Sequence, residues 1–151
     1  MKKRIALLLA VMLSCGFIYS QSNSIHLNLN SKNVAVDGYD VVAYFKEKKA
    51  KVGNKHLKYT YEGAHYFFAT EDNLSLFKAS PQNYLPEFGG WCAYAMGKTG
   101  EKVEIDPESF LITDNKLFLF YDSFFNDTKE KWEKDPENLK AQAYKNWKNL
   151  Y

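Results

Sequence analysis

The chain has 151 residues, enough for one domain with a substantial core, and its aromatic content of 17% excludes a disordered protein. It carries 20 Lys and Arg against 18 Asp and Glu, a net charge of +2. Three of the basic residues lie at positions 2–4, so the remainder carries 17 against 18 and lacks the basic stripe that nucleic-acid binding requires.

The first twenty residues have the pattern of a secretory signal. The three basic residues at positions 2–4 precede an apolar run over 5–19 that is short for a bilayer span. We expect cleavage near residue 20 and export by a bacterium to the periplasm or outside the cell. The stretch "MLSC" leaves a second interpretation, in which Cys15 is lipidated and anchors the protein. No later segment is apolar enough to predict a transmembrane helix.

A polar lead-in and a single domain are expected after the signal. Residues 21–33 are polar without a clear period, and we interpret them as a flexible lead-in to a domain over 34–151. Asp37-Gly38 predicts a turn at its start. The apolar block over 41–45 is too short for periodicity to distinguish a helix from a strand.

A β-hairpin and a helix are predicted next. Alternating aromatics over 58–69 surround a turn at Glu62-Gly63. Thr70 is a suitable N-cap for a helix over 71–79, with acidic residues in its first turn. Pro81 ends that helix.

A turn-rich bridge leads to a second hairpin. The stretch "WCAYAM" after Gly90 predicts a short helix over 91–96. The hairpin is expected over 110–121, with Asp114-Asn115 as its turn. On its return strand, Leu117, Leu119 and Tyr121 alternate.

The last third is predicted to be helical. One amphipathic helix is expected over 124–134, and a second over 136–149 with Asp135 as its cap and Pro136 at its first position. An apolar stripe on the second consists of Leu139, Ala143 and Trp147. Hairpins and helices without alternating βαβ units indicate an α+β fold, with two hairpins packed against several short helices and two C-terminal helices.

The order of glycines and aromatics resembles a known family. The stretches that carry the resemblance are "DGYDVVAYF", "YTYEGAHYFFATEDNLSLFKASPQNYLPEFGGWCAYA" and the closing "NW". Over about 34–148, this order is similar to that of secreted bacterial YHS-domain proteins. The wider family includes modules attached to copper- and other heavy-metal-transporting ATPases, which implies metal handling. The three cysteines of those modules correspond to Ala43, Ala69 and Asn73, which are not soft-metal ligands, so that particular site does not carry over.

Cys92 is the one cysteine expected to remain after Cys15 leaves with the signal or is lipidated, which excludes an internal disulfide. A thiol at a helix N-terminus could react or bind Cu(I). The favoured interpretation is a small buried hydrophobe beside Trp91 and Tyr94. If a metal binds, we expect copper, held by Cys92 with Met96 and His65.

Other candidate sites are weaker. A ligand pocket is expected where the hairpins meet "GGWCAYA", with Trp91, Tyr94 and Tyr66 in its wall. Gly89-Gly90 is better explained by close backbone packing than by anion binding. Asp37 and Asp40 are more typical of local caps than of a general base.

No catalytic motif occurs in the chain. The sequence therefore favours a non-enzymatic envelope binding or accessory module whose partner is a small ligand or a metal ion, with copper as the metal. The alternative is a thiol enzyme with Cys92 as nucleophile and His65 as base.

Overall fold

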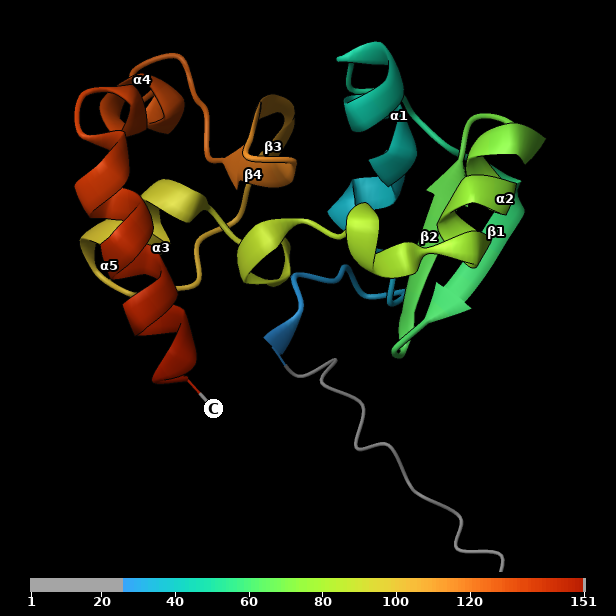
Figure 1. Ribbon diagram of the computed structural model, residues 1–151, viewed down its shortest axis with the longest axis horizontal. Helices are drawn as coiled ribbons and strands as arrows, with labels where there is room; N and C mark the ends of the chain where they lie inside the picture. The colour runs from blue at the N-terminus through green and yellow to red at the C-terminus, as the bar shows by residue number, and fades with distance from the viewer. Residues whose placement is uncertain (1–25, 151) are drawn as a thin grey trace, which may run out of the picture.

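The computed structural model describes residues 26–150 (Figure 1). The signal peptide and the lipidation of Cys15 lie outside these residues and stay predictions. No described helix is both long enough and apolar enough to cross a membrane.

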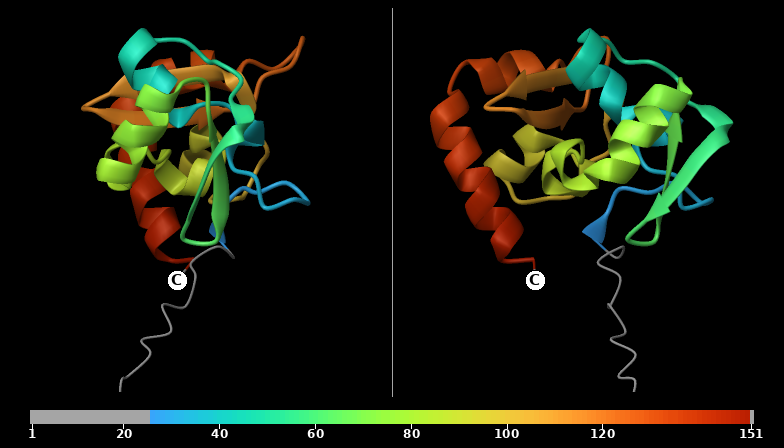
Figure 2. Two further views of the ribbon diagram at one scale, coloured as in Figure 1. Left: turned by 90° about the vertical axis from the view of Figure 1, so that its right-hand side faces the viewer. Right: turned by 45° about the vertical axis from the view of Figure 1, so that its right-hand side comes forward.

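The fold is α+β, as the sequence predicts. Two antiparallel hairpins pair β1 with β2 and β3 with β4, and helices lie around them (Figures 1 and 2). In chain order the elements are η2 (Val36–Gly38), α1 (Val41–Glu47), β1 (Asn54–Tyr61), β2 (Ala64–Phe68), α2 (Glu71–Ala79), η3 (Pro81–Asn83), η4 (Glu87–Gly90), α3 (Ala93–Lys98), β3 (Asp106–Thr113), β4 (Lys116–Phe120), α4 (Thr128–Glu133) and α5 (Pro136–Lys148).

The apolar block that was open between helix and strand forms α1, because Asp40 caps it. One Asp40 oxygen accepts hydrogen bonds from the backbone N–H groups of Val42 (2.9 Å) and Ala43 (3.3 Å). The other accepts from Ala69 N (2.8 Å) and the Asn73 amide (2.7 Å). This buried carboxylate therefore joins α1 to α2 and to the residue that follows β2, which supports its interpretation as a cap.

Both hairpins turn where the sequence predicts. Glu62-Gly63 and Asp114-Asn115 all have positive φ, the conformation of a type I′ turn. Each hairpin begins about four residues earlier than expected, because its first strand contains an irregularity in register, between 54 and 58 in β1 and between 106 and 110 in β3. Such irregularities interrupt the alternation from which strands are predicted.

Strand β4 is buried on both faces. Leu117 and Leu119 belong to a first cluster with α1, α2 and the β1–β2 hairpin, whereas Phe118 and Phe120 belong to a second cluster with α3, α4 and α5. The predicted alternation thus holds for Leu117 and Leu119, on one side of a strand that separates two cores, whereas Tyr121 lies just after the strand.

The helix expected over 124–134 begins only at Thr128. Asp127 caps it by accepting a hydrogen bond from Glu130 N (2.9 Å). Phe124 and Phe125 consequently lie in the loop before the helix, with 94% and 93% of their surface exposed. The prediction was wrong for residues 124–127 because Asp127, a good N-cap, follows the aromatic pair.

Helix α5 carries the predicted stripe. Ala143 is buried, and Leu139 and Trp147 pack against the second cluster. Gly97 of α3 makes the contact with α5 possible, since a Cβ there would lie 2.6 Å from the carbonyl oxygen of Leu139. Helices α3 and α5 therefore cross at backbone contact distance.

Candidate functional site

Cys92 is fully buried at the N-cap of α3. Its sulfur accepts a hydrogen bond from Tyr121 N (3.3 Å) and lies 3.5 Å from the hydroxyl oxygen of Thr128. That hydroxyl in turn donates to the carbonyl of Tyr121. The thiol therefore fastens α3 to the loop between β4 and α4, and does not reach solvent.

The three residues expected to hold copper do not form a convergent site. His65 belongs to β2, which lies on the opposite side of the domain from α3 (Figures 1 and 2). Its Nδ1 lies 2.9 Å from the hydroxyl oxygen of Thr60. Met96 is buried in the second cluster. The described residues contain no group of three His, Cys, Asp or Glu side chains arranged for a metal. Copper binding stays a prediction, without an assembled site to support it.

A pocket of about 300 Å³ lies where the two clusters meet. Most of the lining residues are apolar or aromatic and three are polar, but polar atoms make up slightly more of the exposed wall than apolar atoms do. The lining residues are Leu27, Ala35, Val36, Glu62, Tyr66, Gln82, Leu85, Pro86, Glu87, Phe88, Gly89 and Trp147. Pockets that bind small organic molecules combine apolar and aromatic residues with a few polar groups, and both kinds of residue are present here.

Leu27, near the N-terminal end of the described residues, forms part of the pocket wall. Residues 26–28 lie along η4: Asn28 N donates to Gly89 O (2.8 Å), and the Trp91 indole donates to the carbonyl of His26 (2.7 Å). This part of the expected flexible lead-in is thus hydrogen-bonded to the domain, while the boundaries near 20 and 33 stay predictions.

Gly89 is required at this wall. Its φ is +62°, and a Cβ there would lie 2.9 Å from His26 O and 3.0 Å from the Trp147 ring. The preceding residue, Phe88, also has positive φ (+54°). The structure therefore supports close packing as the reason for this glycine.

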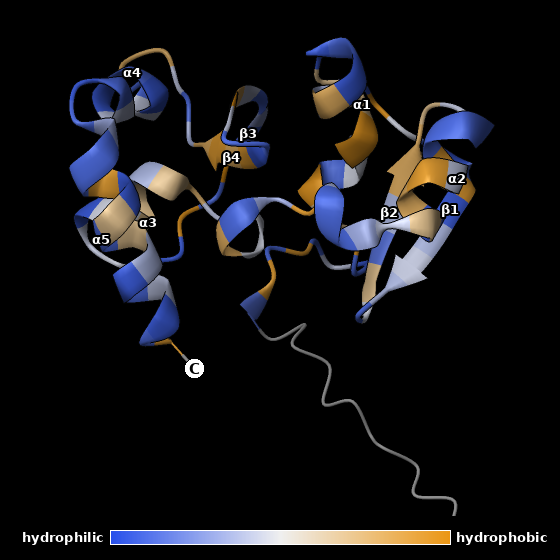
Figure 3. Cartoon of the chain, viewed as in Figure 1, coloured by the Kyte–Doolittle hydropathy of each residue, from blue (hydrophilic) through white to orange (hydrophobic). Residues whose placement is uncertain are grey.

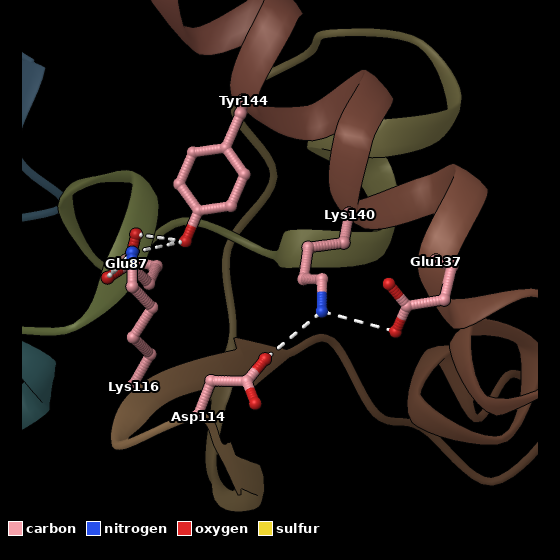
Figure 4. Close-up of polar contacts among 6 residues, drawn as sticks. All are labelled: Glu87, Asp114, Lys116, Glu137, Lys140 and Tyr144. Atoms are coloured by element: carbon pink, nitrogen blue, oxygen red, sulfur yellow. Dashed lines mark hydrogen bonds and ion pairs between the residues drawn. The ribbon is translucent and has the colours of Figure 1, made fainter.

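Glu87 connects the pocket to the second hairpin and α5 (Figure 4). Its carboxylate accepts a hydrogen bond from the Tyr144 hydroxyl (2.7 Å) and pairs with the Lys116 ammonium (3.4 Å), which itself donates to Tyr144 (2.8 Å). The bond to Tyr144 and the charge of Glu87 raise the pKa of Lys116. Burial and Glu87 raise the pKa of Tyr144, against the lowering effect of Lys116. The negative charge of Glu87 is thus largely balanced.

A second polar group in Figure 4 holds α5 to the same hairpin. The Lys140 ammonium lies 3.2 Å from both Asp114 of the turn and Glu137 of α5. Asp114 and Glu137 are mostly exposed, so the group contributes little to stability.

Of the three residues expected to line a pocket, one does. Tyr66 forms part of the wall. Trp91 instead bonds to His26, and Tyr94 packs against the second cluster. The contributions of Leu27 and Trp147 were not predicted, because these residues reach the pocket only through long-range packing. The stretch "LPEFGG" (residues 85–90), read only as a turn, offered a signal in its mixture of apolar side chains and glycines.

Comparison with protein families detects a YHS domain at residues 42–87. The match covers α1, the first hairpin and α2, and ends inside η4 at the pocket. Searches of curated proteins and of solved structures gave no significant match. The chain therefore contains a YHS domain, and the hairpin and helices that build its second cluster lie beyond the matched segment.

Proposed function

We propose that this protein is a non-enzymatic binding module of the bacterial envelope, which holds a small organic ligand in the pocket between the two clusters. The observation that carries the proposal is the pocket itself, which is lined by aromatic and aliphatic residues together with Glu62, Gln82 and Glu87. The export pattern of residues 1–20 supports the envelope location.

The buried state of Cys92 favours this function over the thiol enzyme. A nucleophile must reach its substrate and lie within hydrogen-bond distance of its base. The Cys92 sulfur is instead enclosed and bonded to the backbone, and His65 contacts Thr60. The same enclosure weighs against a copper site built on this thiol.

The wall indicates the kind of ligand. A volume of about 300 Å³ is at the lower end of small-molecule pockets. Trp147, Phe88 and Leu85 suit a flat or branched apolar body, while Gln82 and Glu62 suit a hydrogen-bond donor at one end. We therefore infer a neutral or weakly cationic amphipathic molecule.

The test uses the neutral fluorophore N-phenyl-1-naphthylamine as a probe. Its emission should rise when it enters the pocket of the purified protein. Gln82→Trp should fill the mouth of the pocket and weaken probe binding by roughly tenfold, which corresponds to about 1.4 kcal/mol. Gln142→Trp, on the exposed side of α5, is the matched control and should bind as the wild type does.

Equal probe binding by Gln82→Trp and Gln142→Trp would contradict the proposal. Competition against a Cu(I) chelator tests the metal alternative in the same preparations. Tight copper binding that is lost in folded Cys92→Ala and His65→Ala, with no probe binding, would replace the small-molecule proposal with metal handling.

A further inference from the structure

Two adjacent phenylalanines form the tip of the loop that joins β4 to α4. Phe124 and Phe125 are almost completely exposed, and their rings meet edge to face at 4.8 Å. The loop stands out from the body of the domain in Figure 2, and Figure 3 shows hydrophobic colour along it. Exposed apolar surface of this kind marks a contact with a membrane or a protein.

The loop is built to present these rings. Ser123 N donates to Asn126 O (3.3 Å), and Asn126 N donates to Ser123 O (3.0 Å). These two hydrogen bonds place the two phenylalanines at the centre of a tight turn. At its base, Thr128 N donates to Tyr121 O (3.2 Å), and Cys92 holds Tyr121 N. The rings are therefore displayed from a fixed base that the second cluster supports.

The charges beside the tip are mixed. Asp122 and Asp127 flank the aromatic pair, and Lys129 and Lys131 follow in α4, where the Lys131 ammonium bonds to the Asn126 side chain. Glu130 lies between these lysines, and over residues 122–134 four acidic side chains oppose three lysines, so the two signs nearly balance. A partner attracted by charge alone, such as a polyanion, is not favoured by this surface.

We infer that this aromatic tip inserts into the surface of a phospholipid bilayer. The two rings would enter the boundary between headgroups and acyl chains, and the turn backbone and the flanking charges would remain among hydrated headgroups. Two side chains give weak, reversible attachment, as single short anchors do. This inference does not depend on the pocket or its ligand.

A bilayer fits the tip better than a protein partner does. Two rings on a convex turn offer far less than the roughly 1,200–2,000 Å² that stable protein complexes bury. A bilayer needs no complementary pocket, because its apolar interior adapts to any convex shape. The balanced flanks also suit a surface of mixed or neutral headgroups.

The test measures co-flotation of the full protein with vesicles of phosphatidylethanolamine and phosphatidylglycerol. The wild type should bind, and the F124S/F125S double variant should bind at least roughly tenfold more weakly. Val52→Ser removes another exposed apolar side chain, 68% exposed, and should bind like the wild type. Binding should persist at high salt, because the rings rather than charges hold the membrane. All variants should melt as the wild type does, since the side chains are exposed.

Three outcomes would overturn the inference. The first is absence of wild-type binding to these vesicles, and the second is unchanged binding by F124S/F125S. The third is loss of binding at high salt, which would assign the contact to charged residues. If the wild type self-associates and the double variant does not, while neither binds vesicles, the rings hold a second copy of the chain and the membrane is excluded.

Discussion

Cys92 illustrates how one side chain connects two elements at the residue scale. Its sulfur accepts a hydrogen bond from Tyr121 N and contacts Thr128 at the start of α4. Cys92→Ala would remove the sulfur that accepts from this partly buried N–H and should lower the free energy of unfolding by about 1–3 kcal/mol. Urea denaturation measures the loss.

Alkylation of the wild-type thiol checks the same burial independently. Iodoacetamide should modify Cys92 slowly in the native protein and rapidly in denaturant, because the sulfur has no exposed surface. Fast native alkylation at mildly acidic pH would show an accessible thiolate, and would restore the enzyme and copper interpretations.

Tyr66 provides a pH-dependent prediction. Burial, followed by the charge of Glu62, raises the pKa of its hydroxyl. The unfolded chain then loses this proton at about pH 10 while the folded protein keeps it. Stability is therefore fully present below that pH and falls as the pH rises above it.

The prediction is tested by measuring the midpoint of urea denaturation from about pH 8 to about pH 11, a range that brackets the ordinary tyrosine pKa. The Tyr66→Phe variant cannot ionise at this position, so its midpoint should fall less steeply. Burial also raises the pKa of Tyr44, so part of the decline should remain. Identical slopes for wild type and variant would exclude Tyr66 as a cause.

At the scale of elements, β4 couples the two clusters. Phe118→Ala and Leu119→Ala remove buried side chains from opposite faces, and each should lower the free energy of unfolding by about 2–5 kcal/mol. Because one strand serves both cores, each variant should still unfold in a single transition. Lys58→Ala, at an exposed position of β1, is the control and should have little effect. Two separate transitions would show that the clusters fold independently.

The elements also show which signals the sequence carries locally. The cap at Thr70 accepts from Asn73 N (3.1 Å), and the turns at Glu62-Gly63 and Asp114-Asn115 occur as predicted, because each depends on neighbouring residues alone. The start of α4 was misplaced because helical spacing extends across Phe124 and Phe125, whereas the Asp127 cap decides the boundary. At this boundary the cap outweighs the helical spacing that precedes it.

At the scale of the whole molecule, the segment that matches the YHS domain is not a complete core. The first cluster takes Leu117 and Leu119 from β4, about thirty residues beyond the match at 42–87. We therefore expect a fragment of residues 26–90 to remain unfolded. Circular dichroism and proton NMR dispersion of the fragment, beside the full chain, provide the measurement. A cooperatively folding fragment would contradict this dependence on β4.

The same dependence explains why the site was only partly predicted. Tyr66 could be named from the hairpin, but Leu27 and Trp147 lie far apart in sequence and meet at the pocket only after both clusters have formed. The Glu87 network likewise joins η4, β4 and α5. No local sequence pattern predicts these long-range contacts. The fold class could therefore be predicted from the sequence, whereas the pocket wall could not.

The two-sided burial of β4 has a consequence for how the chain finds its fold. In most hairpins a slip of one residue exposes the apolar face to water, and this penalty selects the correct pairing. A slip of β4 would instead exchange leucines for phenylalanines between two apolar environments. Selection must then come from side-chain volume and from the positive φ angles at Asp114 and Asn115. Hairpins with a shifted register are consequently the expected kinetic traps during folding, and the conformation of the turn at Asp114-Asn115 disfavours them.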